Sequence, residues 1–183
     1  MRVCKAICIN TKMSQQITFA PIFSFRNSNE REQLLVWRKS LRDENKNLVF
    51  TNGVFDILHH GHVSYLKEAR NLGDALIIGV NADTSVKRLK GEKRPLQDES
   101  DRANILAALK SADCVVIFDD DTPLSLIEFV LPDILVKGAD WNVENVVGRD
   151  VVEKNGGKVL TIPFIKGRST TGVVEKVIER YTK

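Results

Sequence analysis

Five short apolar runs recur along this chain, and segments with helical periodicity separate them. Their residues are largely β-branched or otherwise aliphatic, and the runs cover 48–52, 75–80, 114–118, 134–136 and 159–162. Strands that are covered on both faces have this continuous apolar character. Alternation of strand and helix implies a parallel sheet with right-handed crossovers. The sequence therefore predicts an α/β fold, in which a Rossmann-like five-stranded parallel sheet carries helices on both faces.

Helical periodicity and capping residues place the helices. They are expected over 30–42, 61–72, 99–109, 122–130, 149–155 and 170–181, with a short helix from Asp83 and a loop over 89–98. Thr122 is the expected N-cap before Pro123. Residues 1–27 show no clean period and are predicted to form a poorly ordered arm. Residues 28–183 are predicted to form a single domain with a leading helix at 28–45.

Size, charge and cysteine content narrow the classes of function. At 183 residues the chain can build one domain with a real core. Its net charge of +3 is too mild to indicate nucleic-acid or membrane binding, and it suits polyanionic ligands. No apolar run approaches the ~20 residues that a membrane span needs. The three cysteines lack zinc-like spacing, so Cys114 is expected in the core and the protein in the cytoplasm.

The run from Phe50 to His62 points to a phosphate site. It reads as the end of a strand, a short turn, and then His59-x-Gly61-His62 where a helix begins. Backbone N–H groups at a helix start lack partners, and the helix dipole there is positive. Two imidazoles beside those groups favour binding of a phosphate.

Polar side chains also follow the other expected strands. Ligands of parallel sheets bind beyond the carboxyl ends of the strands, so these side chains are expected at one rim. Besides Thr51, Asn52, Asp56, His59 and His62, the rim would hold Asn81, Asp83, Lys87, Arg88, Lys90, Arg94, Lys137, Gly138, Asp140, Trp141, Lys166, Gly167, Arg168, Ser169, Thr170 and Thr171.

Alternatives stay open for several of these residues. Asp56 either binds a metal or hydroxyl or orients the turn through an Asx bond. Trp141 either stacks on a base or sugar or fills the core. The hydroxyls of Ser169–Thr171 either cap the last helix alone or also bind phosphate.

The missing motifs and the available cations narrow the reaction. The chain contains no P-loop, no Gly-x-Gly-x-x-Gly after the first strand and no Gly-x-Ser-x-Gly elbow. Paired histidines with lysines indicate stabilisation of a triphosphate while pyrophosphate leaves. A phosphate monoester has a second pKa of about 6, so as acceptor it is already a dianion and needs no general base. Positioning and electrostatics would then supply the catalysis.

These motifs resemble those of the nucleotidyltransferase superfamily that has an HxGH motif and includes cytidylyltransferases and class I aminoacyl-tRNA synthetases. More closely, they are similar to the D-glycero-β-D-manno-heptose 1-phosphate adenylyltransferases, which also occur fused to a sugar kinase in a bifunctional bacterial enzyme. The matching stretches are Phe50-Thr-Asn-Gly-Val-Phe-Asp-Ile-Leu-His, Gly79-Val-Asn-Ala-Asp, Arg88-Leu-Lys-Gly, Arg94-Pro95, Asp101-Arg102, Leu135-Val-Lys-Gly-Ala-Asp and Ser169-Thr-Thr. Val54 and His60 depart from the usual Cys and Pro of that family.

The resemblance implies that ATP and heptose 1-phosphate give ADP-heptose, a lipopolysaccharide precursor, and pyrophosphate. Mg²⁺ would be carried with ATP, without a protein metal site, and relatives are commonly homodimers. The implied catalytic residues are His59, His62 and Lys90. The implied nucleotide-binding residues are Thr51, Asn52, Gly53, Gly61, Lys137, Gly138, Ser169, Thr170 and Thr171. The implied substrate-binding residues are Asp56, Asn81, Asp83, Arg94 and Arg102.

Two other functions remain as alternatives. One is a glycerol-3-phosphate cytidylyltransferase-like enzyme that uses CTP, which the sequence Gly138-Ala-Asp-Trp also resembles. The other is a nucleotide-binding regulator without catalysis. Retention of both motif histidines and of the hydroxyls before the last helix speaks against the regulator.

Overall fold

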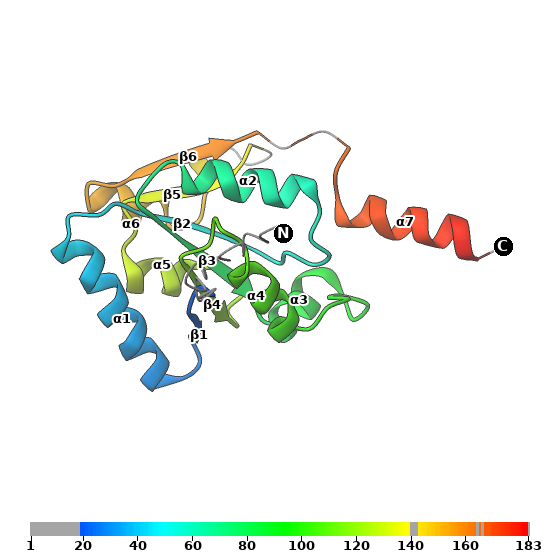
Figure 1. Ribbon diagram of the computed structural model, residues 1–183, viewed down its shortest axis with the longest axis horizontal. Coiled ribbons are helices and arrows are strands. Elements are labelled where there is room, and N and C mark those ends of the chain that lie inside the picture. The colour runs from blue at the N-terminus through cyan, green and yellow to red at the C-terminus, as the bar shows by residue number, and fades with distance from the viewer. Residues whose placement is uncertain (1–18, 140–142, 164, 166, 183) are drawn as a thin grey trace, which may run out of the picture.

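A six-stranded, wholly parallel sheet forms the centre of the molecule (Figure 1). The computed structural model describes residues 19–139, 143–163, 165 and 167–182. In the order β1-β4-β3-β2-β5-β6, the strands are β1 (Ile22–Ser24), β4 (Cys114–Phe118), β3 (Ala75–Asn81), β2 (Leu48–Gly53), β5 (Ile134–Gly138) and β6 (Lys158–Ile162). The predicted α/β class and parallel sheet are confirmed.

The number of strands was predicted wrongly, because residues 22–24 were assigned to a poorly ordered arm. They form the edge strand β1, in which Ile22 pairs with Val115 and Ser24 pairs with Ile117. Three residues are too few to show a period in the sequence, and pairing along β4 is what makes them a strand. The rest of the predicted arm, residues 1–18, lies outside the described residues.

The helices lie close to their predicted positions. They are α1 (Ser28–Asp43), α2 (His60–Arg70), α3 (Asp83–Lys90), α4 (Glu99–Ala107), α5 (Leu124–Val130), α6 (Arg149–Lys154) and α7 (Thr170–Tyr181), with a 3₁₀ turn at Val143–Asn145. Two details of the prediction are wrong. Pro123, not Thr122, occupies the N-cap position of α5, and it makes no side-chain cap. The first two residues of the predicted loop, Leu89 and Lys90, belong to α3.

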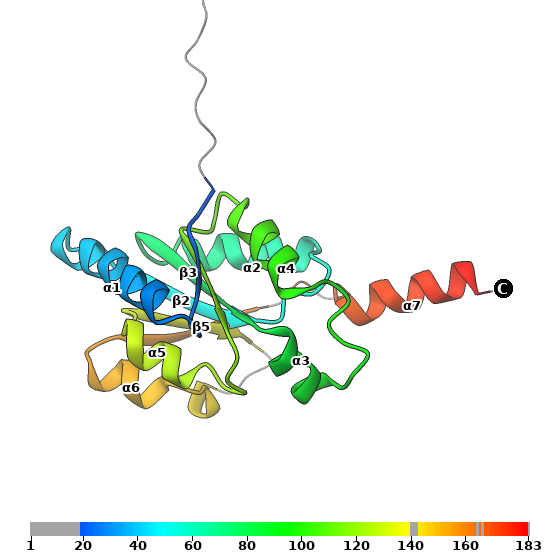
Figure 2. The ribbon, with the colours of Figure 1, turned by 90° about the horizontal axis from the view of Figure 1, so that it is seen from below.

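Helices cover both faces of the sheet, as predicted (Figure 2). On one face, Leu66 of α2 and Leu106 of α4 pack with Ile78 of β3. On the other face, α1, α5 and α6 pack over alternate strand residues such as Phe50, and Cys114 is fully buried there as expected. Because successive strand residues point to opposite faces, both faces must be apolar, which explains the continuous apolar runs.

All six strands point the same way, so the loops after them meet at one edge of the sheet. The last helix, α7, begins at this edge and projects away from the sheet in both views (Figures 1 and 2). Within the described part of the chain, no helix combines the length and apolar character needed to cross a bilayer.

Candidate active site

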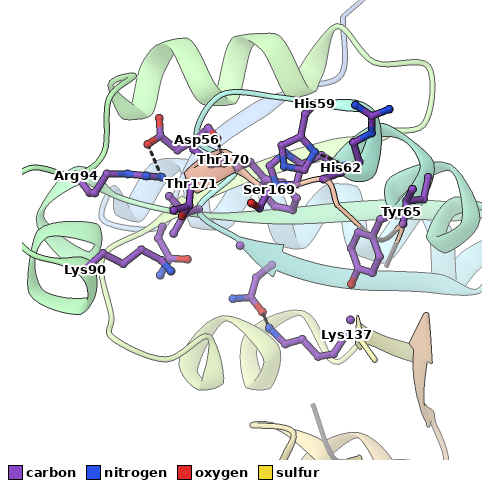
Figure 3. Close-up of a pocket in the computed structure, with 18 of the residues that line it drawn as sticks. Asp56, His59, His62, Tyr65, Lys90, Arg94, Lys137, Ser169, Thr170 and Thr171 are labelled. Carbon is purple, nitrogen blue, oxygen red and sulfur yellow. Dashed lines mark hydrogen bonds and ion pairs between the residues drawn. The ribbon is translucent and has the colours of Figure 1, made fainter. Parts of the chain in front are cut away.

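A cleft of about 980 Å³ opens at the carboxyl edge of the sheet (Figure 3). Its walls come from the carboxyl ends of β2, β3 and β5, from the segments that follow β2 and β3, and from the start of α7. Most residues predicted for the site line it, namely Asn52, Gly53, Asp56, His59, His62, Asn81, Lys90, Arg94, Lys137, Gly138, Ser169, Thr170 and Thr171. The volume lies at the upper end of the range of about 300–1,000 Å³ for ligand sites.

The two motif histidines stack on each other at the start of α2. Their ring centroids are 3.8 Å apart with an interplanar angle of 15°, and the edge of Phe55 contacts His62 at 5.5 Å between centroids. His59 is the N-cap of α2, because its Nδ1 accepts the backbone N–H of His62 over 3.4 Å. The stack therefore ties both imidazoles to the positive end of the helix.

Gly61 supports this stack instead of lining the cleft. A Cβ at this position would lie 3.1 Å from the His59 ring and 3.2 Å from Cβ of Arg168. The glycine therefore lets the segment before α7 approach the start of α2 closely. This packing gives a physical reason for a glycine between the two histidines.

Both imidazoles are neutral at pH 7 in the free protein. Burial and, secondarily, His59 lower the pKa of His62 to about 4, against the opposing charge of Asp56. Burial also lowers the pKa of His59, and the Arg168 cation adds to that effect. Since Nδ1 of His59 accepts a hydrogen bond, its proton is assigned to Nε2. Nδ1 of His62 is buried without a hydrogen-bond partner.

Asp56 holds three segments of the site together. Its carboxylate, 1% exposed, accepts the N–H groups of Leu96 at 2.9 Å and Gln97 at 3.0 Å. It also pairs with Arg94 at 2.8 Å (Figure 3), while its carbonyl accepts the Thr170 hydroxyl at 2.6 Å. These partners lie far away in the chain, so the carboxylate links distant segments and does not form the local Asx bond, which was one of the two alternatives.

Four cationic side chains of the described residues line the cleft. Lys90 and Arg94 come from α3 and the loop after it, and Nε of Arg94 is buried without a hydrogen-bond partner. Lys137, in β5, hydrogen-bonds Oδ1 of Asn52 in β2 (Figure 3). The fourth is Arg168, which lies just before α7. A polyanion in the cleft would meet positive charge from three sides.

Four residues predicted to contact ligands do not line the cleft: Thr51, Gly61, Asp83 and Arg102. Thr51 is fully buried, and its hydroxyl lies 2.6 Å from that of Tyr65. The Arg102 guanidinium is buried behind the wall, bonded to the carbonyl of Val54 at 2.7 Å and to Asp83 at 2.7 Å. These groups brace the loops that carry the site.

Sequence reasoning missed other residues that do line the cleft, among them Tyr65, Phe55 and Ile165. Tyr65 follows His62 by three positions, which places both on the same side of α2. Arg168 was expected at the rim without a named ligand role, and it does line the cleft. Arg88 instead pairs with Asp119 and Asp121. Asp140, Trp141 and Lys166 lie outside the described residues.

The start of α7 lines the cleft beside the histidines (Figure 3). Ser169 is its N-cap, with the side chain accepting the N–H of Gly172 at 3.1 Å, so the predicted capping role is confirmed. Among the described residues, no cluster of three His, Cys, Asp or Glu side chains could hold a metal ion.

Comparison with known proteins assigns the chain to a family. Residues 50–172, which include every segment lining the cleft, match the family described as Cytidylyltransferase-like. The chain belongs to the cytidylyltransferase-like family.

Individual relatives agree with this family assignment. The "Bifunctional protein HldE" of Citrifermentans bemidjiense is 60% identical over 136 residues, which cover 74% of this chain and 28% of that protein. The "Bifunctional protein HldE" of Pelobacter propionicus is 55% identical over 152 residues, covering 83% and 31%. The chain thus spans less than a third of the length of these relatives.

A solved structure agrees with the fold. It is described as the lipopolysaccharide core biosynthesis protein from Thermoplasma volcanium, with a TM-score of 0.55 and 32% sequence identity. The similarity covers 67% of this chain and 99% of that one. The fold of this cytidylyltransferase-like chain is therefore found in a relative of known structure.

Proposed function

We propose that this cytidylyltransferase-like chain transfers AMP from ATP to D-glycero-β-D-manno-heptose 1-phosphate, giving ADP-heptose and pyrophosphate. One observation carries the proposal: two stacked, neutral histidines at the start of α2 lie beside the start of α7, in a cleft that is lined by cationic side chains. The names of the relatives, HldE and a lipopolysaccharide core biosynthesis protein, support the heptose over other sugars.

The reaction needs no group that removes a proton from the acceptor. An oxygen of the sugar 1-phosphate, already a dianion at neutral pH, attacks the α-phosphorus of ATP. A new P–O bond forms, the bond from the α-phosphorus to the bridging oxygen breaks, and pyrophosphate leaves with that electron pair. Negative charge therefore develops on the leaving group, and the site must stabilise it there.

The histidines are placed to perform this stabilisation. His59 donates from Nε2–H, and His62 contacts the phosphates from the inner position of the stack. Because both imidazoles are neutral before binding, the approach of a triphosphate would raise their pKa and draw protons onto them. Lys90 and Arg168 would add fixed positive charge near the phosphates, and the hydroxyls of Ser169–Thr171 would bind phosphate oxygens.

Arg94 is the group we assign to the acceptor phosphate. Asp56 holds one end of its guanidinium at 2.8 Å, while its Nε stays buried without a hydrogen-bond partner beside the cleft. A buried donor without a partner is costly, and a phosphate oxygen would satisfy it. Asn81 also lines the cleft, and we assign it to the sugar as a hydrogen-bonding group.

Further parts of the proposal concern the ion, the assembly and the compartment. Mg²⁺ is carried into the site by ATP, and when bound it offsets charge on the phosphate chain. The protein works as a homodimer in the cytoplasm, where ATP is available. A sugar kinase that supplies the sugar 1-phosphate would act before this chain.

A pyrophosphate-release assay tests the proposal by crossing two nucleotides with two acceptors. ATP and CTP are each offered with heptose 1-phosphate and with glycerol 3-phosphate. We expect turnover in only one of the four pairings, that of ATP with heptose 1-phosphate. Turnover with CTP and glycerol 3-phosphate would establish the cytidylyltransferase alternative, and nucleotide binding without turnover in any pairing would establish the inactive regulator.

A further inference from the structure

Helix α7 carries an apolar stripe that nothing in the described chain covers. No residue of this helix is buried. Three of its large apolar side chains are exposed: Val177 is 52% exposed, Ile178 is 53% exposed and Tyr181 is 82% exposed. The helix projects from the body in both views (Figures 1 and 2). An isolated helix of twelve residues is marginal in water, so α7 needs a packing partner.

The stripe faces away from the rest of the protein. A second pocket, of about 360 Å³, lies between the start of α2 and α7, and α7 lines it with Gly172, Val173, Glu175, Lys176 and Glu179. At 100° per residue all of these positions except Val173 lie on the side of the helix away from the stripe, and Val173 lies at the edge of the stripe. The polar side of α7 therefore turns toward the protein and its apolar side turns toward solvent, the reverse of an ordinary surface helix.

We propose that a second copy of this chain covers the stripe, by packing its own α7 alongside in parallel. This inference rests on the proposed homodimer and identifies its surface and its consequence for the site. A continuous apolar patch with polar borders is typical of an interaction surface.

The charges beside the stripe favour a second copy over other occupants. On the helical wheel, Arg180 borders one edge of the stripe and Glu175 borders the other, while Lys176 and Glu179 lie further round, toward the second pocket. A two-fold axis parallel to the helices places the basic edge of one copy against the acidic edge of its partner. These four charges sum to zero, whereas helices that bind anionic membranes are rich in lysine and arginine.

The size of the contact sets its strength. Twelve residues make a helix about 18 Å long, so two such helices bury less than the ~800 Å² per partner of a standard stable interface. We therefore expect a reversible monomer–dimer equilibrium that depends on protein concentration.

Pairing would also act on the candidate active site, because α7 begins inside the cleft. Ser169 caps the helix there, and the Thr170 hydroxyl bonds to the carbonyl of Asp56 at 2.6 Å. A partner that stabilises the helix keeps these groups in place for phosphate. Loss of pairing should thus weaken ATP binding without touching the histidines.

The test replaces the stripe while keeping the helix. In the double variant Val177→Gln/Ile178→Gln, glutamine has a higher helix propensity than either residue it replaces. The matched control is Val36→Gln, since Val36 is 71% exposed on α1, far from the site in sequence. Sedimentation velocity is run from about 1 to 100 μM, a range chosen around the affinity of weak dimers.

We expect wild-type protein and Val36→Gln to dimerise across this range and the double variant to remain monomeric. The KM for ATP of the double variant should rise roughly tenfold, because an effect of about this size is expected when a helix N-terminus no longer binds an anion. A monomeric wild type, a double variant that still dimerises, or a wild type whose α7 binds anionic vesicles instead would each overturn the inference. A wild type that dimerises through α7 without turning over ATP and heptose 1-phosphate would contradict only the proposed function.

Discussion

Replacing His62 by glutamine should make the protein less sensitive to mild acid. The pKa of His62 is lowered to about 4, mainly by burial, so the folded protein keeps this imidazole neutral where the unfolded chain protonates it. The unfolded state then binds more protons between pH 6.5 and 4, and the free energy of unfolding falls as pH drops through this window. Above pH 6.5 the neutral His62 side chain makes its full contribution to the free energy of unfolding.

The size of the effect follows from the two pKa values. A difference of 2.5 units corresponds to an upper limit of about 3 kcal/mol, of which about 2 kcal/mol is lost by pH 5. Because the ring is partly exposed and water screens it, we expect about 1 kcal/mol at pH 5. His62→Gln should therefore lose about 1 kcal/mol less stability than wild type between pH 7.5 and pH 5.

Urea unfolding at pH 7.5, 6 and 5 measures this difference, with His60→Gln as the control because His60 is exposed at the same helix start. The control should lose stability in parallel with wild type. Equal losses for wild type and His62→Gln, or an NMR titration of His62 near pH 6.5, would refute the reasoning.

Three further outcomes follow from the site. His62→Ala should lower kcat by about a hundredfold or more, the scale of losing a transition-state donor; wild-type turnover would contradict the role of the histidines. Tyr65→Phe should cost about 1–3 kcal/mol of stability in urea unfolding, because the buried Thr51 hydroxyl loses its 2.6 Å partner; an unchanged midpoint would contradict this. Arg94→Lys, which keeps the charge beside Asp56 but loses the forked donor, should raise the KM for the sugar phosphate about tenfold, with kcat little changed. A rise in the KM for ATP alone would reassign Arg94 to the nucleotide.

The apolar runs alone were enough to predict the α/β class, the parallel sheet and the edge where the site lies. Each interior strand is apolar on both faces, and such a pattern has few other stable solutions. The HxGH motif likewise placed His59 and His62 at a helix start, because the glycine and the preceding strand are local signals. The strand at 22–24 could not be predicted, since its three residues become a strand only by pairing with β4.

The roles of the polar residues depended on folding, because hydrogen-bond partners far apart in the chain cannot be read from spacing. The sequence left two roles possible for Asp56, ligand binding and a local turn. Its hydrogen-bond partners Leu96 and Gln97 lie forty residues or more away in the chain. Arg102 has the charge of a ligand-binding residue, yet its guanidinium is buried against Val54. The apolar side of α7 was evident as a helical period, but only the tertiary arrangement revealed that this side faces solvent.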